Sequence, residues 1–309
     1  MEQIRSLSAL LDYAKKLGAE QGPKTVSVAM AENAGLISCL EEARVSGIAN
    51  SILVGNTDKI ASAAKEAGVD LSNFEVVDEK NEVKMGLVAV EKVSSGKADI
   101  YMKGQLHTNN FLRGMLNKEV GLRRGKNVIS HCYFHSIEGF DRIFFICDAA
   151  FNMYPELAQK ASIIQNTVNF ARALGVREPK VAVLAAVEVV NPDMPCTLDA
   201  SALTQMNRRG QITNCIVDGP FALDNAINEE SAKTKGIVSP VAGSADILAV
   251  PDIEAGNVLA KAIVYFSKNE TAGLILGAAA PVVLTSRADS PRAKLLSLSA
   301  AVALSAFQK

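Results

Sequence analysis

A polar segment near the C-terminal end of the chain carries residue types that suit phosphate binding. Ser286 and Arg287 follow residues 274–284, an almost wholly apolar run that is typical of a strand or tight turn buried in a parallel sheet. Ser290 and Pro291 then predict the N-cap and first residue of a helix, so free N–H groups face the polar segment. A hydroxyl, a guanidinium and a helix N-terminus together favour phosphate binding. The alternative is a capped helix whose arginines form surface ion pairs.

A second group of polar residues follows the predicted strand 98–102. Lys103 comes directly after this strand, and His107, Thr108 and Arg113 lie at the start of the next predicted helix. A lysine at a strand end, with hydroxyl and amide side chains at a helix start, is another arrangement that binds anions. His107 is a candidate acid–base group, and the alternative is a cap or a structural hydrogen-bonding residue.

Two loops in the second half of the chain are candidates for ligand contact. Asp218 precedes Gly219-Pro220, a pair that predicts a turn at the carboxyl end of a strand, where ligand groups gather. The alternative role of Asp218 is turn formation alone. Ser239 and Gly243 belong to a loop before a strand, where glycine lets a phosphate or an adenine approach the backbone. The alternative is an ordinary connecting loop.

Several well-known ligand motifs are absent from the sequence. The chain contains no GxxxxGK[ST], GxSxG or CxxC motif, and no convincing GxGxxG follows its first predicted strand. His131 and His135 have a spacing that binds metal on a helix, but their segment reads as strand and loop. We therefore expect no metal site and no nucleotide site of these kinds.

Short apolar strands alternate with amphipathic helices along most of the chain, which predicts an α/β fold. In the first part of the chain, the predicted strands cover residues 25–30, 51–55, 74–77 and 98–102. This rhythm favours mostly parallel, helix-covered sheets whose ligands bind at the carboxyl ends of the strands.

The rhythm breaks in the middle of the chain. The predicted strands 127–133 and 142–147 are joined by a short connection, which favours an antiparallel pair. We expect a second α/β domain to begin here. Residues 1–137 then form the first domain, completed by the C-terminal helix 291–309, and residues 138–290 form the second. The expected architecture has two lobes with a cleft between them.

The composition is that of an ordinary globular protein and excludes several function classes. The chain has 309 residues, 49% of them hydrophobic, and a formal net charge of -1, which gives no reason to expect nucleic acid or membrane binding. Five cysteines without a CxxC pair indicate a reducing compartment. No apolar segment is long enough to cross a membrane. We expect a cytoplasmic protein.

Four segments, taken in order, resemble the phosphate acetyl/butyryl transferase family, and most closely its butyryltransferase branch. The resemblance covers most of the chain, and the matching segments are residues 103–113, 218–226, 251–257 and 285–290. It implies a two-lobed fold like that of isocitrate and isopropylmalate dehydrogenases, in which the C-terminal helix returns to the first lobe. It also implies homodimers or assemblies of dimers that work without metal or nucleotide cofactor.

The family transfers an acyl group between coenzyme A and inorganic phosphate, with both substrates bound at once. By the resemblance, Ser286 would donate a hydrogen bond to the coenzyme A sulfur, and Arg287 would bind phosphate and the thioester carbonyl oxygen. Thr108 and Arg113 match family positions that hold phosphate or acyl phosphate.

The remaining candidates complete this expected site. Lys103 and His107 are expected beside the phosphate, and Asp218, Ser239 and Gly243 are expected at the cleft near coenzyme A, which is a substrate here and not a cofactor.

One position departs from the family pattern. The acetyltransferase branch has a general-base aspartate where this chain has Ala293. Asp289 is the expected substitute. The alternative is that no dedicated base exists, because a thiol with a pKa of about 8.5 needs little help to leave.

The resemblance favours a short acyl chain, with butyryl preferred over acetyl. Three rival interpretations stay open. They are an NAD- and metal-dependent decarboxylating dehydrogenase of the same fold, a non-catalytic acyl-CoA or acyl-phosphate sensor, and a phosphate acyltransferase that uses fatty acyl-carrier protein.

Overall fold

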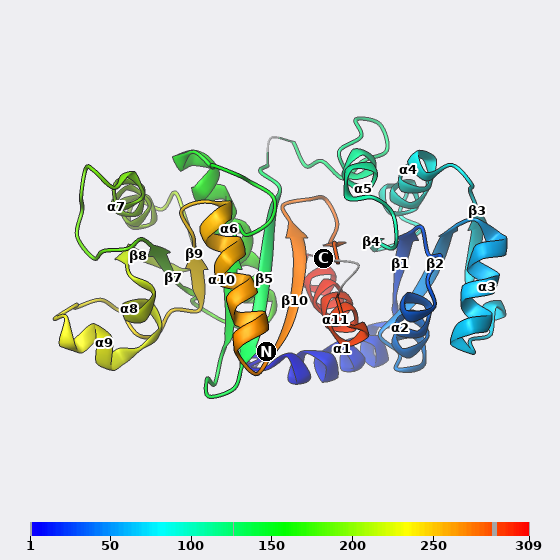
Figure 1. Ribbon diagram of the computed structural model, residues 1–309, viewed down its shortest axis with the longest axis horizontal. Coiled ribbons are helices and arrows are strands. Elements are labelled where there is room, and N and C mark those ends of the chain that lie inside the picture. Colours follow the sequence, from blue (N-terminus) through cyan, green and yellow to red (C-terminus); the bar gives the residue numbers. More distant parts are fainter. Residues whose placement is uncertain (1, 126, 286–288, 309) are drawn as a thin grey trace. The chain divides into compact units, whose positions relative to one another are not determined.

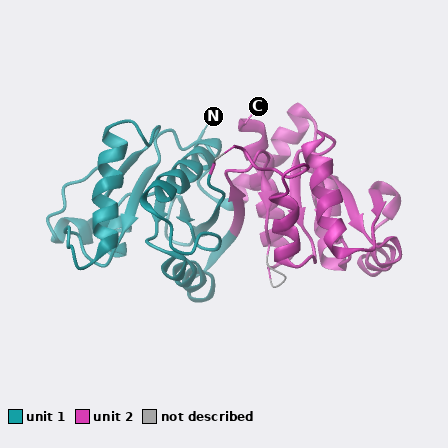
Figure 2. Cartoon of the chain, turned by 90° about the horizontal axis from the view of Figure 1, so that it is seen from above, with its two compact units in different colours: residues 1–7, 128–271 teal, residues 8–127, 272–309 magenta. Residues whose placement is uncertain are grey.

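The chain folds into two compact α/β units, shown in teal and magenta in Figure 2. The structure is a computed structural model that describes residues 2–125, 127–285 and 289–308. Unit 1 comprises residues 1–7 and 128–271, and unit 2 comprises residues 8–127 and 272–309. The expected α/β class with mostly parallel strands is confirmed.

Unit 2 is built around a mostly parallel sheet. In sheet order its strands are β3 (Glu75–Asp78), β2 (Ala49–Gly55), β1 (Lys24–Ala29), β4 (Ile100–Lys103), β11 (Val282–Val283) and β10 (Asn269–Leu276), of which β10 begins in unit 1. Neighbouring strands are parallel except β10 and β11, which are antiparallel. The apolar segment 274–284 therefore forms the end of β10, a turn and β11.

Helices cover both faces of this sheet. They are α1 (Leu7–Gln21), α2 (Ala34–Val45), α3 (Thr57–Ala67), α4 (Glu82–Ser94), α5 (Thr108–Met115) and α11 (Pro291–Phe307), with a short 3₁₀ helix at Leu71–Asn73. α2 packs against α3 and α11, whereas α4 packs against α5 and against β1, β2 and β4 (Figure 1). Right-handed crossovers place α2 and α4 on opposite faces.

The neighbouring strands β1 and β4 form a switch point in this topology. The connection after β1 leads to α2 on one face, and the connection after β4 leads to α5, which packs on α4 on the other face. In open α/β sheets, such a point leaves a crevice at the carboxyl ends of the two strands, where ligands bind.

Asparagine caps explain why three helices of unit 2 begin where they do. Asn33, Asn56 and Asn81 precede α2, α3 and α4, and the side-chain oxygen of each accepts a hydrogen bond from a backbone N–H in the first turn. α11 starts as the sequence predicts, because Ser290 Oγ accepts the N–H of Ala293 and Pro291 occupies the first helical position.

The strands of unit 1 are also mostly parallel, with one antiparallel strand. Their order is β5 (Ser130–Ile137), β6 (Ile143–Cys147), β9 (Ile247–Ala249), β7 (Lys180–Leu184) and β8 (Ile216–Phe221). β5 and β6 are antiparallel, as the short connection between them predicts, and the other neighbours are parallel. The helices are α6 (Leu157–Ala173), α7 (Pro195–Arg208), α8 (Leu223–Ile227), α9 (Glu229–Thr234) and α10 (Ile253–Phe266).

Two apolar layers hold unit 1 together. On one side, Phe170 of α6 packs edge to face against Phe134 and Phe145, with ring centroids 5.1 Å and 5.6 Å apart. On the other side, a buried cluster joins β6, β7 and β9 to α8 and α10, and it includes Phe144 and Leu248. The strands are therefore buried on both faces, as expected for parallel sheets.

The expected turn at Gly219-Pro220 is wrong, because β8 continues through both residues to Phe221. Pairing with β7 resumes at Leu184 and Phe221 after an irregularity, so Gly219 and Pro220 form a bulge and not a turn. Asp218 consequently lies inside β8 and not at its carboxyl end.

The compact units divide the chain at 7/8, 127/128 and 271/272, whereas the sequence predicts domain boundaries at 137/138 and 290/291. β5 belongs to unit 1 because its partner strand is β6, and β11 belongs to unit 2 because it pairs with β4.

Candidate active site

A small pocket lies at the switch point between β1 and β4 in unit 2. It is lined by residues that follow β1, residues that follow β4 and residues on both sides of the start of α11, namely Asn33, Leu36, Lys103, Gly104, Gln105, Thr285 and Lys294. Its cavity volume is about 50 Å³. One water needs roughly 10–15 Å³, so the pocket has room for a small anion. Two lysines line it, and none of its lining residues in the described part of the chain is a carboxylate.

Lys103 places a buried ammonium group in this pocket. It is the last residue of β4 and only 4% exposed. Its Nζ donates hydrogen bonds to the carbonyl oxygens of Gly104 at 3.4 Å and Thr285 at 3.5 Å. A carbonyl oxygen accepts a hydrogen bond without carrying a full negative charge.

Gly104 allows the segment after β4 to pack against the end of β1. Its N–H donates to the carbonyl oxygen of Ala29 at 2.9 Å. A Cβ at this position would lie 2.2 Å from the carbonyl oxygen of Met30, so only glycine fits. The close contact brings Lys103 beside the first turn of α2.

Asn33 brings the N-terminus of α2 to the pocket. Its Oδ1 caps the helix by accepting the N–H of Leu36 at 3.0 Å. Since the oxygen is engaged in the cap, the Nδ2 group is what the side chain can offer to a ligand. The donor suits an anion.

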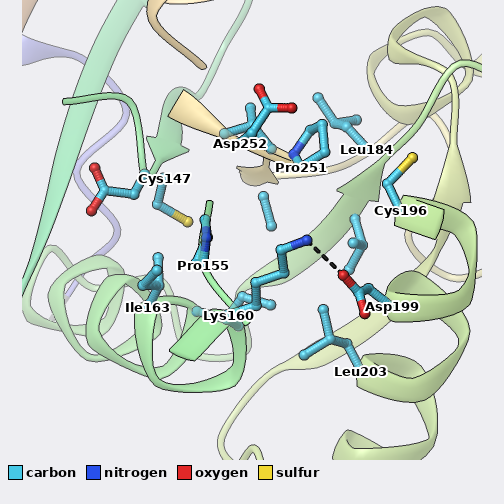
Figure 3. A pocket seen from close by; sticks show the side chains of 15 residues that line it. Cys147, Pro155, Lys160, Ile163, Leu184, Cys196, Asp199, Leu203, Pro251 and Asp252 are labelled. Carbon is cyan, nitrogen blue, oxygen red and sulfur yellow. Dashed lines mark hydrogen bonds and ion pairs between the residues drawn. The ribbon is translucent and has the colours of Figure 1, made fainter. Parts of the chain in front are cut away.

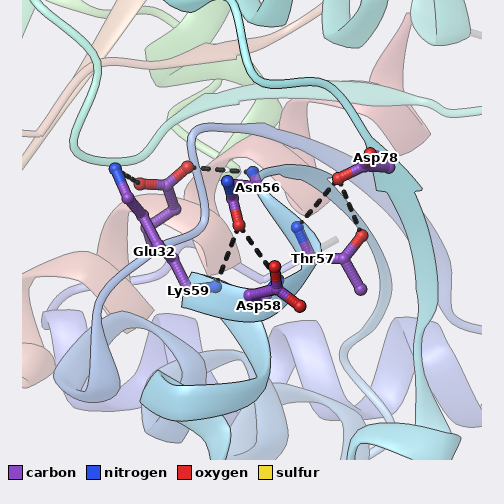
Figure 4. A network of polar contacts seen from close by, with 6 residues as sticks. All are labelled: Glu32, Asn56, Thr57, Asp58, Lys59 and Asp78. Carbon is purple, nitrogen blue, oxygen red and sulfur yellow. Dashed lines mark hydrogen bonds and ion pairs between the residues drawn. The ribbon is translucent and has the colours of Figure 1, made fainter.

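A network of polar contacts fixes the segment before α2 (Figure 4). Glu32 Oε1 accepts the N–H of Asn56 at 2.9 Å, and Glu32 Oε2 lies 3.4 Å from Lys59 Nζ. Asp78 accepts both the N–H and the hydroxyl of Thr57, each at 3.0 Å, and these hydrogen bonds lower the pKa of the Asp78 carboxyl. The network ties the carboxyl ends of β1, β2 and β3 together beside the pocket.

α11 contributes the second lysine. Lys294 lies in the first turns of this helix, and its Nζ reaches back to donate to the carbonyl oxygen of Asp289, which precedes the N-cap. Asp289 is half-buried, and its carboxylate is not part of the pocket lining. Asp289 stays a prediction for the general base.

The two residues expected to carry the chemistry, Ser286 and Arg287, lie outside the described residues. They follow Thr285, which lines the pocket. The roles assigned to them from the resemblance therefore stay predictions.

The other candidates of unit 2 lie on α5 and not in the pocket lining. His107 occupies the N-cap position of α5 without a side-chain cap hydrogen bond. The side chains of His107, Thr108 and Arg113 are exposed. The structure thus brings Lys103 together with Thr285, but it does not bring these three side chains into the same pocket.

Asp218, Ser239 and Gly243 belong to unit 1 and have structural contacts there. Asp218 Oδ1 accepts the N–H of Gly219 at 3.0 Å, and Ser239 Oγ accepts the N–H of Val241 at 3.1 Å. Gly243 has a positive φ of 72°, and a Cβ there would lie 2.6 Å from Cα of Glu229. A ligand role for these three residues stays a prediction.

The sequence interpretation missed two polar residues that line the pocket, Asn33 and Lys294, whereas Gln105 lies within the segment 103–113 that it singled out. Asn33 carried a usable signal, because a helix-capping side chain directly after the first strand lies at the carboxyl edge of the sheet. Lys294 gave a weaker sequence signal, because a lysine in the first turns of a helix usually points into solvent.

Unit 1 has a pocket of a different kind at the carboxyl ends of β6, β7 and β9 (Figure 3). Its lining is mostly apolar, and Lys160 Nζ lies 2.6 Å from Asp199 Oδ2 within it. The cavity volume is only about 10 Å³. This is roughly the space of one water, so this pocket has no room for a substrate.

Within the described residues, no cluster of three or more His, Cys, Asp or Glu side chains is arranged to hold a metal ion. None of the described helices is long and apolar enough to span a membrane.

Comparison with known proteins gives consistent matches. Residues 82–303 match the family described as "Phosphate acetyl/butaryl transferase". A phosphate butyryltransferase of Clostridium acetobutylicum is 50% identical over 278 residues, which cover 90% of this chain and 92% of that protein. A phosphate acetyltransferase of Thermotoga maritima is 43% identical over 292 residues, covering 94% and 97%.

A solved structure agrees with these matches. A branched-chain phosphotransacylase from Enterococcus faecalis V583 superimposes with a TM-score of 0.81 at 31% identity, covering 91% of this chain and 99% of the other. The resemblance inferred from four short segments is confirmed along nearly the whole sequence. The chain belongs to the phosphate acetyl/butyryl transferase family.

Proposed function

We propose that this chain is a phosphate acyltransferase that moves a short-chain acyl group, preferably butyryl, between coenzyme A and inorganic phosphate. The observation that carries the proposal is the pocket at the β1–β4 switch point. Lys103 and Lys294 face it, none of its described lining residues is acidic, and Ser286 and Arg287 follow directly after Thr285 of its lining. The 50% identical phosphate butyryltransferase favours butyryl over acetyl.

The reaction needs a phosphate oxygen held against the thioester carbonyl carbon. The oxygen forms a bond to this carbon, the C–S bond breaks with its electron pair on sulfur, and the phosphate proton passes to the thiolate or to solvent. Arg287 binds the phosphate and the developing oxyanion, and Ser286 donates a hydrogen bond to the leaving sulfur. One such preorganised donor lowers the barrier by about 3 kcal/mol.

The remaining roles form part of the same proposal. Lys103 holds the phosphate, and His107, Thr108 and Arg113 of the α5 start contact phosphate or acyl phosphate. Asp289 is the candidate base. Coenzyme A is a substrate, and no cofactor is proposed.

Residues of unit 1 are proposed on the coenzyme A side. They are Asp218, Ser239 and Gly243. Substitution of Ser239 tests the coenzyme A side best, because the positive φ at position 243 requires glycine for structural reasons.

Release of free thiol tests the function. Purified protein would receive inorganic phosphate and, in separate wells, acetyl-, propionyl-, butyryl-, isobutyryl- or acetoacetyl-CoA, with a disulfide reagent reporting the thiol. We expect phosphate-dependent release that is fastest with butyryl-CoA. A maximum at acetyl-CoA would keep the reaction and change the preferred substrate. Silence with every thioester would overturn the proposal.

The expected homodimer also belongs to this proposal. α10 exposes large apolar side chains, with Val258 69%, Tyr265 77% and Phe266 90% exposed. A second copy of the chain would cover such a surface. Light scattering of wild type and Phe266→Asp tests it: a dimer that dissociates in the variant supports the assignment, and a monomeric wild type contradicts it.

A cytoplasmic location is proposed from cysteine usage. Cys39, Cys132, Cys147, Cys196 and Cys215 are all free in the structure. Four of these thiols are buried and that of Cys196 is half-buried, and free thiols suit a reducing compartment.

A further inference from the structure

Lys294 occupies an electrostatically unfavourable place for a lysine. Its ammonium reaches back past the N-terminus of α11 to the carbonyl oxygen of Asp289. Helix N-termini carry a partial positive charge, so cations are normally found at the opposite end of a helix. A purely structural lysine gains little from this position.

The surroundings of Lys294 do not neutralise it. Among the described residues, no carboxylate lies within 4.0 Å of its Nζ, and its hydrogen-bond acceptor is a backbone oxygen. Its side chain is half-buried and lines the same cavity of about 50 Å³ as Lys103. Two like charges that share a small cavity repel each other and favour the entry of an anion.

The N-terminus of α2 adds to the same field. Asn33 and Leu36 bring this helix end to the pocket, and the capping geometry leaves Asn33 Nδ2 as a donor. Two lysines, an amide donor and the start of α2 thus converge on one small space. All of these groups favour negative charge, and together they suit a tetrahedral oxyanion.

We propose that Lys294 is a phosphate-binding residue, and that its ammonium and that of Lys103 hold the same phosphoryl group. This inference rests on the proposed acyltransferase function. It also bears on Ala293, which occupies the position where the acetyltransferase branch has a general-base aspartate. The neighbouring position supplies a cation, which favours the more negative and more nucleophilic form of inorganic phosphate and reduces the need for a carboxylate base.

Removal of the Lys294 charge tests the proposal. Lys294→Met keeps an apolar stem of similar length, Lys294→Arg keeps the charge, and Lys65→Met removes an exposed lysine on α3 as a matched control. Titration calorimetry with inorganic phosphate reports binding without turnover. We expect Lys294→Met to weaken phosphate binding by about 10- to 100-fold, the size of one lost charge-assisted hydrogen bond. Lys294→Arg should retain most of the affinity.

Steady-state kinetics give the second readout. The KM for phosphate should rise in Lys294→Met by a similar factor, whereas the KM for acyl-CoA should stay within threefold of wild type, about the scatter of such measurements. Unchanged phosphate affinity in a folded Lys294→Met variant would overturn the proposal. A rise in the KM for acyl-CoA alone would also overturn it, because Lys294 would then belong to coenzyme A binding.

The two proposals fail in distinguishable ways. If wild type binds phosphate through Lys294 but transfers no acyl group, the proposed function fails and the phosphate role of Lys294 survives. If wild type is active and Lys294→Met binds phosphate normally, the function survives and the inference fails.

Discussion

The carboxyl ends of β4 and β6 each carry a buried charged residue, but the hydrogen bonds to the two charged groups differ. Lys103, the last residue of β4, is 4% exposed, and Asp148, directly after β6, is 3% exposed. The carboxylate of Asp148 accepts the N–H groups of His131, Ala150 and Phe151 at 2.9–3.0 Å and Nδ2 of Asn152 at 2.6 Å. The carbonyl oxygens near Lys103 lie at 3.4 Å and 3.5 Å.

The volume of the cavity beside each charged group also differs. The pocket that Lys103 lines has about 50 Å³, whereas the pocket that Asp148 lines has about 10 Å³. Burial of a charge at a strand end therefore does not identify a ligand site by itself. Asp148 is satisfied by protein donors and holds the loop after β6, whereas Lys103 borders room for an anion.

The largest effect is expected for Arg287, which lies two residues after Thr285 in the sequence. Arg287→Ala should lower kcat/KM by about 100- to 1,000-fold, because it removes a donor to the developing oxyanion. Arg292→Ala, in the same segment and bonded to Ser8 Oγ, should stay near wild type. The thiol-release assay measures both. Near-normal turnover in Arg287→Ala would contradict the catalytic role proposed for Arg287.

Substitution of Asp148, directly after β6, should change the free energy of unfolding. Asp148→Ala leaves three buried or half-buried backbone N–H groups without their acceptor and should lower the free energy of unfolding by about 3–5 kcal/mol. Asp141→Ala, which removes an exposed partner of Arg5, should cost less than about 1 kcal/mol. Urea denaturation compares the two. Equal costs would show that the Asp148 hydrogen bonds contribute no more than a surface pair.

Lys103→Met should show the opposite pattern. We expect the KM for phosphate to rise by about 10- to 100-fold through loss of one charge-assisted contact. The free energy of unfolding should be unchanged or higher, since replacing a buried charge by an apolar side chain is often stabilising. A large loss of stability with normal phosphate kinetics would make Lys103 a structural residue like Asp148.

A smaller effect is expected on the pH dependence of stability, through the buried histidines of β5. Burial lowers the pKa of His135 to about 4, and it does the same for His131, whose neighbours are Asp148 and Lys261. The unfolded state then binds more protons than the folded state between pH 6.5 and 4, so stability falls as the pH drops through this window. His135 alone should cost about 2 kcal/mol between pH 7 and pH 5.

Urea denaturation at both pH values checks this expectation. His135→Phe should reduce the loss of stability on acidification, and His107→Gln, an exposed histidine, should leave it unchanged. An unaltered pH dependence in His135→Phe would show that another group titrates.

Local sequence patterns predicted most elements but not how distant segments meet. The alternation of strands and helices, the antiparallel β5–β6 pair and the Ser290 cap all follow from short-range preferences. The end of β8 was harder to predict, because Gly-Pro normally ends a strand. Here β8 pairs with β7 again after Gly219-Pro220. Tertiary pairing overrode the local turn preference.

The candidate site shows the same limit. Lys103 was found from its place at a strand end, and its contact Thr285 is 182 residues away in the sequence. The order of the strands around β1 and β4 decides which residues share the pocket, and no local pattern contains that order. For this reason the sequence interpretation identified Lys103, at the end of β4, but missed Asn33 and Lys294.

A crystal structure of the protein with inorganic phosphate tests the central claim most directly. We predict a tetrahedral ion in the β1–β4 pocket, within hydrogen-bond distance of the ammonium groups of Lys103 and Lys294. A phosphate bound elsewhere, with this pocket holding only water at saturating phosphate, would contradict the account.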